Sequence, residues 1–94
     1  MPTLLEFMYH PAAAEQLEDL IDSDIRYEDE VANYEWILCR EPEQLGGLAV
    51  IQGQHLVYIF LTAQKRSGPP RLAVSYQVFR KDSFIHVLDV RIAP

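Results

Sequence analysis

The apolar positions in the first half of the chain recur with the period of an α-helix. Two such runs follow one another: Ala13, Leu17, Leu20 and Ile21 form the first, and Tyr27, Val31, Tyr34 and Leu38 form the second. Pro11 suits the first turn of a helix, where its missing N–H is not needed, and Pro42 disfavours helical backbone at the residue before it. The spacing therefore predicts a helical hairpin over residues 11 to 40.

The segments on either side of this hairpin have the composition of β-strands. Residues 3 to 9 predict a short first strand that ends at His10 and Pro11. After Gly46 and Gly47, four apolar segments follow, at residues 48 to 52, 55 to 63, 71 to 79 and 83 to 92, with turn residues between them. We expect three or four antiparallel strands joined as hairpins. The chain is thus predicted to form one α+β domain over residues 1–94, in the order β-α-α-β-β-β, with the helical hairpin packed on a small antiparallel sheet.

Part of each predicted strand is apolar on both faces. In the segment 56 to 62, apolar side chains occupy alternate positions on either side of the strand. A hairpin of two short helices covers only one face of a sheet. We therefore expect Tyr58, Phe60 and Phe79 on a second face that needs a partner chain, a remote segment or a ligand.

The charge of the chain is divided unevenly along its 94 residues. The net charge of −6 is the sum of −10 over residues 1 to 45 and +4 over residues 46 to 94. The total argues against a general polycation that coats nucleic acid or anionic membrane. A modest basic surplus nevertheless remains on the predicted strands and their turns.

The single cysteine and the short apolar runs indicate an intracellular protein. Cys39 has no second cysteine with which to form an internal disulfide, which favours a reducing compartment. The longest apolar stretch, residues 56 to 61, is far shorter than the roughly 20 residues that a membrane helix needs. We expect a cytoplasmic protein that does not enter a membrane.

Three segments, in this order and spacing, resemble the RelE/ParE superfamily of bacterial toxin-antitoxin toxins. They are FMYHPAAAEQLEDL (7 to 20), ILCREPEQLGG (37 to 47) and RLAVSYQVFRKDSFIHVLDVRIA (71 to 93). The resemblance spans nearly the whole chain, and it implies a toxin that a cognate antitoxin neutralises. It also implies two kinds of target, since RelE-like members cut messenger RNA on the ribosome and ParE-like members bind DNA gyrase.

The resemblance implies a set of catalytic residues for the RelE-like branch that this chain matches poorly. Cleavage by attack of a 2′-hydroxyl on the next phosphate needs a base, an acid and cations. Tyr58 and Phe60 stand where the paired lysines of that branch would fall. The remaining candidates are Arg71, Tyr76, His86 and Arg91, with Tyr76 and His86 as a hypothetical acid–base pair. A binding role is therefore favoured over a metal-independent endoribonuclease.

The basic residues of the second half are candidates for binding a partner. They are Lys65, Arg66, Arg71, Arg80, Lys81 and Arg91, and they fit phosphates, an acidic antitoxin or plain solvated turns. The histidines are His10, His55 and His86, and they lie too far apart in sequence to form a metal-binding motif, so we expect no metal and no cofactor. Three functions stay open: a toxin or degenerate relative that acts by binding, a homodimeric interaction module, and a ribosome-dependent nuclease.

Overall fold

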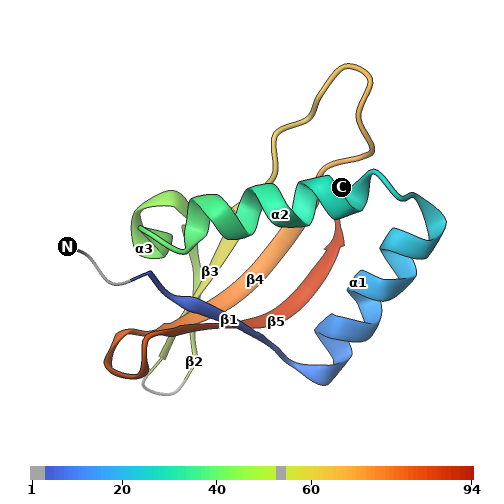
Figure 1. Ribbon diagram of the computed structural model, residues 1–94. Coiled ribbons are helices and arrows are strands. Elements are labelled where there is room, and N and C mark those ends of the chain that lie inside the picture. Colours follow the sequence, from blue (N-terminus) through green and yellow to red (C-terminus); the bar gives the residue numbers. More distant parts are fainter. Residues whose placement is uncertain (1–3, 53–54) are drawn as a thin grey trace.

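The structure is a computed structural model that describes residues 4–52 and 55–94. Its elements are β1 (Glu6–Tyr9), α1 (Pro11–Ser23), α2 (Tyr27–Leu38), α3 (Pro42–Leu45), β2 (Gly47–Gln52), β3 (His55–Leu61), β4 (Leu72–Phe79), a 3₁₀ turn η1 (Arg80–Asp82) and β5 (Phe84–Ile92). The predicted α+β class, with helices packed on a small sheet, is confirmed (Figure 1). Thr3, the expected start of the first strand, and the turn expected at Gly53 lie outside the described residues.

The five strands form one mixed sheet in the order β1-β5-β4-β3-β2. The strands β2 to β5 are an antiparallel meander, as expected. The first strand instead joins the far edge of the sheet parallel to β5, with Met8 beside His86 and Tyr9 beside Val87. The sheet is therefore mixed rather than purely antiparallel. The helices lie between β1 and the meander in the chain, so β1 joins the sheet through a long connection and not through a hairpin.

Local sequence signals explain where the helices begin. His10 accepts the backbone N–H of Ala12 through Nδ1 at 3.2 Å, and Pro11 takes the first position of α1. Three acidic residues, Glu28, Asp29 and Glu30, occupy the first turn of α2, where the positive end of the helix dipole favours them. The short helix α3, which the apolar pattern did not predict, begins at Pro42.

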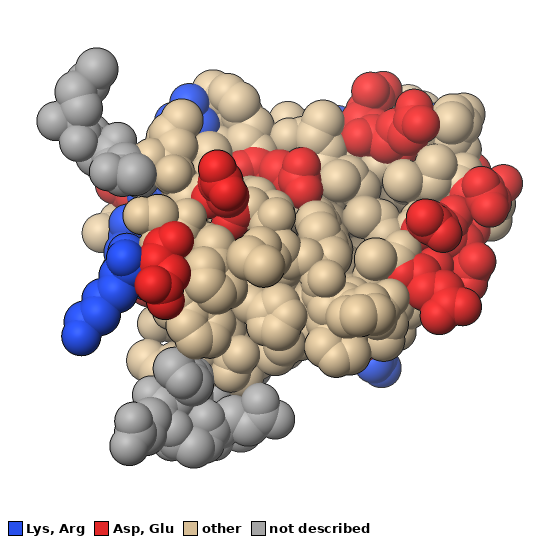
Figure 2. Space-filling view, turned by 60° about the horizontal axis from the view of Figure 1, so that its bottom comes forward, with Lys and Arg blue, Asp and Glu red and all other residues tan. Residues whose placement is uncertain are grey.

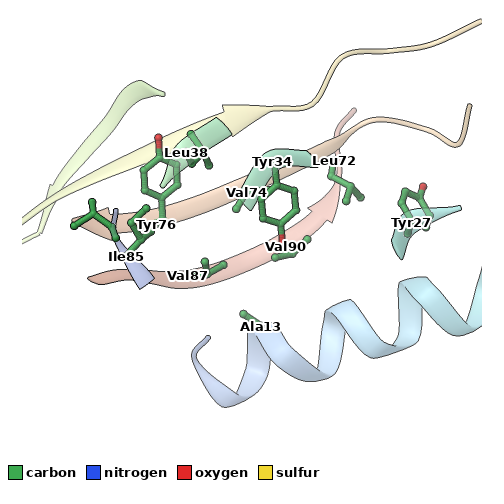
Figure 3. Close-up of a cluster of buried hydrophobic side chains, with 11 residues drawn as sticks. Ala13, Tyr27, Tyr34, Leu38, Leu72, Val74, Tyr76, Ile85, Val87 and Val90 are labelled. Atoms are coloured by element: carbon green, nitrogen blue, oxygen red, sulfur yellow. The ribbon is translucent and has the colours of Figure 1, made fainter. Parts of the chain in front are cut away.

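The hydrophobic core lies between the helices and one face of the sheet (Figure 3). Its buried members are Leu5, Ala13, Tyr27, Tyr34, Leu38, Leu72, Val74, Tyr76, Ile85, Val87 and Val90. Four of the eight residues in the two predicted helical stripes are in this cluster, and the other four pack against it half-buried. The helical pattern in the sequence thus identified the side of each helix that faces the sheet.

One buried hydrogen bond ties α3 to the centre of the sheet. The hydroxyl of Tyr76, on β4, donates to the carbonyl oxygen of Pro42 at 2.6 Å. Gly46 lies against the same ring, and a Cβ placed there would overlap the Tyr76 hydroxyl. Gly46 is therefore required for the close approach of α3 to the sheet, whereas a Cβ on Gly47 would meet only Ile59 O at an ordinary 3.9 Å.

Gly46→Ala is expected to lower the free energy of unfolding by about 1 to 3 kcal/mol, because the added methyl group overpacks the site against Tyr76. Gly47→Ala is the matched control and should change it by much less. Urea denaturation of the two variants measures the difference. Equal losses from both substitutions would contradict the packing described for Gly46.

Candidate functional site

One face of the sheet carries none of the helices found in the described part of the chain. The helices α1 and α2 both lie on the other side of the strands (Figure 1). We call the uncovered side the open face and define it by the exposed and half-buried side chains that alternate with the core residues: Glu6, Met8, Ile59, Leu61, Ala73, Ser75, Gln77, Phe79, Phe84, His86, Asp89 and Arg91. Met8, Ile59 and Leu61 are 53%, 37% and 47% exposed. The open face thus carries apolar side chains in contact with solvent, with polar and charged side chains among them.

The register corrects two of the three residues expected on this face. Tyr58 pairs with Tyr76 and Phe60 with Val74, so both side chains point toward the helices and pack against the core. Their assignment to the second face was wrong, because in a strand that is apolar at every position the sequence does not reveal which alternate set faces inward. Phe79 does lie on the open face, where its ring stacks on Phe84 with centroids 4.7 Å apart.

A broad uncharged area is visible when the lower side of the molecule is turned toward the viewer (Figure 2). Acidic side chains gather at the end where α1 lies, and lysine and arginine side chains appear mainly at the margins. The distribution agrees with the division of charge along the sequence, in which the helical half is acidic. A partner that covers this side therefore meets mostly uncharged side chains in the middle and charges around them.

The hypothetical acid–base pair of Tyr76 and His86 is not assembled. Tyr76 is buried on the helix side of β4, whereas His86 pairs with Gln77 and lies on the open face. The two side chains are on opposite faces of the sheet, so the prediction was wrong. Burial also raises the pKa of Tyr76, and its hydroxyl is already committed to Pro42. Neither general-acid nor general-base chemistry follows from this pair.

Three of the six cations proposed for partner binding are held in ion pairs within the chain. Arg80 contacts Glu43 at 2.7 and 3.0 Å. Arg91 contacts Asp89 at 2.6 and 2.9 Å. The Nζ of Lys65 lies 3.4 Å from a carboxylate oxygen of Glu30. For Arg66, Arg71 and Lys81, no ion pair is found within the described part of the chain.

Arg71 and Arg91, two of the candidate catalytic residues, lie at one end of the sheet. Arg91 pairs with Ala73 across β4 and β5, and the carbonyl of Arg71 accepts the backbone N–H of Ala93 at 2.9 Å. Arg91 is already bonded to Asp89, and the pKa of Asp89 is lowered mainly by that hydrogen bond. No described contact joins Arg71 to His86.

A hydroxyl network that the sequence did not single out joins β1 to α2. The hydroxyls of Tyr9 and Tyr34 lie 2.7 Å apart, and Tyr9 donates to a carboxylate oxygen of Glu35 at 2.8 Å. Burial, and then the neighbouring Tyr34, raise the pKa of Tyr9, and burial raises that of Tyr34. Both hydroxyls stay protonated at neutral pH, and the network is a structural link between the edge strand and the helix layer.

A second unexpected contact protects the edge of β5 where β1 has ended. Gln16 of α1 accepts the backbone N–H of Val90 at 3.1 Å and donates to Asp89 at 3.1 Å. An unpaired strand edge otherwise invites pairing with another chain. A glutamine on a helix has no sequence signature for this role, so only the three-dimensional arrangement reveals it.

Among residues 4–52 and 55–94, no group of three or more histidine, cysteine, aspartate or glutamate side chains is placed to hold a metal ion. The rings of His10 and His86 lie 6.1 Å apart, and the side chain of His55 lies outside the described ones. Within the same residues, no helix is long and apolar enough to cross a membrane. Comparison with known proteins gives no match, either to a family model, to a curated protein or to a solved structure.

The ion pair between Glu43 and Arg80 predicts a specific pH dependence of stability. The hydrogen bond from Arg80 lowers the pKa of Glu43, so the pair stabilises the fold above the unfolded-state value of about 4.3 and ceases to do so as the pH falls through the folded-state pKa. Both side chains are partly exposed, so the contribution is expected to be at most about 1 kcal/mol.

Arg80→Met should therefore reduce the free energy of unfolding at pH 7 and leave it nearly unchanged at pH 2, as measured by urea denaturation over a pH series. Lys81→Met is the matched control, because no ion pair of Lys81 is found among the described residues. A loss in Arg80→Met that is as large at pH 2 as at pH 7 would rule out this electrostatic origin.

Proposed function

We propose that this chain is a RelE/ParE-like toxin, or a degenerate relative of that superfamily, and that it acts by binding a protein partner through the open face. The observed order supports the proposal, because it contains the order β-α-α-β-β-β that the resemblance implies, with the short helix α3 and one further strand added. The family assignment rests on this order and on the three matching segments of the sequence. The target and the antitoxin are to be found experimentally.

The observation that carries the binding role is the composition of the open face. Met8, Ile59 and Leu61 are exposed there, and none of the described helices lies over them. Exposed apolar patches on a small soluble domain commonly mark protein interfaces. The neighbouring polar side chains, Ser75 and Gln77, offer hydrogen bonds to a partner, and the adjacent charges of Asp89 and Arg91 are paired with each other.

The nuclease alternative has weaker support. The lysines of the RelE-like branch are replaced by Tyr58 and Phe60, and both of these now lie on the helix side. Tyr76 and His86 do not meet, and Arg91 is bonded to Asp89. Cations that stabilise a phosphorane must be preorganised around the reacting phosphate. No such arrangement of the candidate residues supports RNA cleavage.

Induced expression of the chain in a bacterial host tests the proposal. Arrest of growth is expected, and it should be relieved by Ile59→Asp, because a carboxylate in place of this exposed apolar side chain of the open face opposes burial against an apolar partner. Ile25→Asp is the matched control, since Ile25 is 65% exposed at the junction of α1 and α2. Circular dichroism verifies that both variants fold.

Retained arrest in Ile59→Asp, or equal relief by Ile25→Asp, would contradict binding through the open face. Absence of any arrest in the wild-type chain, with no antitoxin-like neighbouring gene, would contradict the toxin assignment. His86→Ala is expected to leave the arrest intact, and primer extension on cellular messenger RNA should show no new cleavage sites. Cleavage that His86→Ala abolishes would instead support the nuclease.

A homodimeric interaction module is the second candidate, because the same open face is apolar enough to meet a second copy. Sedimentation equilibrium of the purified chain separates the two functions. A wild-type dimer that becomes a monomer in Ile59→Asp supports self-association through the open face. A wild-type monomer supports binding of a different protein there instead.

A further inference from the structure

A second apolar hollow lies on the other side of the sheet, between α2 and the end of β3. The cleft has a volume of about 200 Å³, and its lining includes Tyr34 and Ile37 from the helix and Phe60 and Ala63 from the strand and the residues after it. In Figure 1, α2 crosses the end of β3, and the long loop that follows this strand extends beyond the helix. We call this hollow the α2–β3 cleft.

The backbone of β3 beside the cleft has an unpaired edge. The pairing of β2 with β3 ends at Gly47 and Ile59. The N–H of Thr62 donates to the carbonyl oxygen of Leu72 at 3.0 Å. In the antiparallel pattern, the backbone N–H and carbonyl groups of Phe60 and Thr62 therefore point toward β4, and those of Leu61 point away from it. Among the described strand pairings, none gives Leu61 a partner on its outer side. Its N–H and carbonyl are thus available to an added strand.

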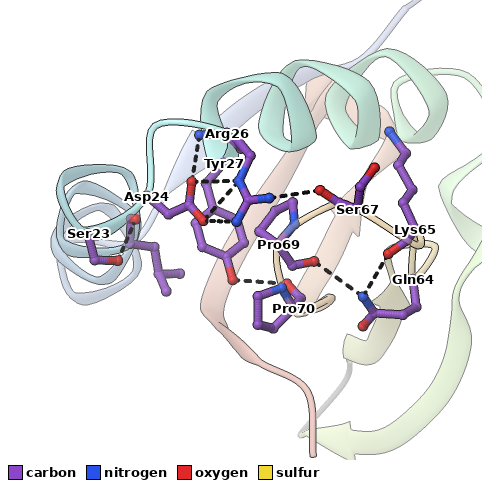
Figure 4. Close-up of polar contacts among 10 residues, drawn as sticks. Ser23, Asp24, Arg26, Tyr27, Gln64, Lys65, Ser67, Pro69 and Pro70 are labelled. Atoms are coloured by element: carbon purple, nitrogen blue, oxygen red, sulfur yellow. Dashed lines mark hydrogen bonds and ion pairs between the residues drawn. The ribbon is translucent and has the colours of Figure 1, made fainter.

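A nearly buried carboxylate stands at the end of the same cleft. The side chain of Glu30 is only 10% exposed, and its described ion-pair partner is Lys65 at 3.4 Å. Lys65 itself is 56% exposed and approaches α2 from the loop after β3 (Figure 4). A buried carboxylate is better satisfied by close, charge-assisted hydrogen bonds than by a distant ammonium group.

The loop that carries Lys65 is fastened to the start of α2, which keeps the cleft in shape. Arg26 donates to the carbonyl of Ser67 at 2.8 Å, and the Tyr27 hydroxyl donates to the carbonyl of Pro70 at 2.9 Å (Figure 4). Asp24 in turn holds the guanidinium of Arg26 at 2.6 Å. The wall of the cleft is therefore preformed, which lowers the entropic cost of binding.

We propose that the α2–β3 cleft docks an extended segment of a partner protein, which pairs its backbone with Leu61 and places a basic side chain against Glu30. Main-chain hydrogen bonds supply affinity in this mode of recognition, and the side-chain pocket supplies selectivity. An arginine fits the charge and shape, because its stem packs on Phe60 and Ile37 while its guanidinium bonds both carboxylate oxygens. Lys65 competes for Glu30 and is displaced. The inference goes beyond the function proposed for the open face and does not depend on it.

Selection of a random dodecapeptide library on the full chain tests this docking site. The enriched peptides are expected to share a lysine or arginine at a fixed distance from an apolar residue. Their affinity should fall at least tenfold in Glu30→Gln and rise severalfold in Lys65→Ala, which removes the competing cation. Hydrogen exchange of the Leu61 amide should slow when such a peptide binds.

Two control variants separate this site from other surfaces. Glu18→Gln removes an exposed acid of α1, and Met8→Asp alters the open face; both should bind the peptides as the wild type does. Failure to enrich any peptide overturns the proposal, as does enrichment of peptides without a basic residue. Equal binding by the wild type and Glu30→Gln, or unchanged exchange at Leu61, overturns it as well. Failure of the open-face proposal would appear instead in Ile59→Asp and leave these results unaffected.

Discussion

The two long helices cover one face of a five-stranded sheet, and this constraint decides the role of each strand residue. Side chains alternate along a strand, so every second residue enters the core and the others meet solvent. On β4 the buried set is Leu72, Val74 and Tyr76, which leaves Ser75 and Gln77 outside. The bond from Tyr76 to Pro42 then fixes α3 over the same face. The open face follows from this one-sided covering.

Much of this arrangement could be predicted from the sequence, because helical and strand periods differ. The spacing of Tyr27, Tyr34 and Leu38 identified the buried side of α2. The strands were harder, since Tyr58 and Ile59 are both apolar and only the pairing with β4 shows which one faces inward. The same ambiguity led to the false pairing of Tyr76 with His86. Parallel addition of β1 also depends on a long-range contact that local patterns do not contain.

The uneven charge along the chain acquires a structural meaning in the folded protein. Glu30 and Glu43 of the acidic half pair with Lys65 and Arg80 of the basic half. These ion pairs join α2 and α3 to the turns at the two ends of β4, and they offset part of the basic surplus that suggested phosphate binding. The remaining surface combines an apolar open face with an acidic helical layer. This combination fits recognition of a protein better than recognition of nucleic acid.

Site-specific photo-crosslinking in living cells tests the central claim most directly, because it reports contact at one chosen residue. A benzophenone amino acid in place of Ile59 is expected to give a discrete covalent adduct with another protein chain, whereas the same group in place of Ile25 gives none. Adducts at position 25 but not at position 59 would contradict the account, and so would the absence of an adduct at both.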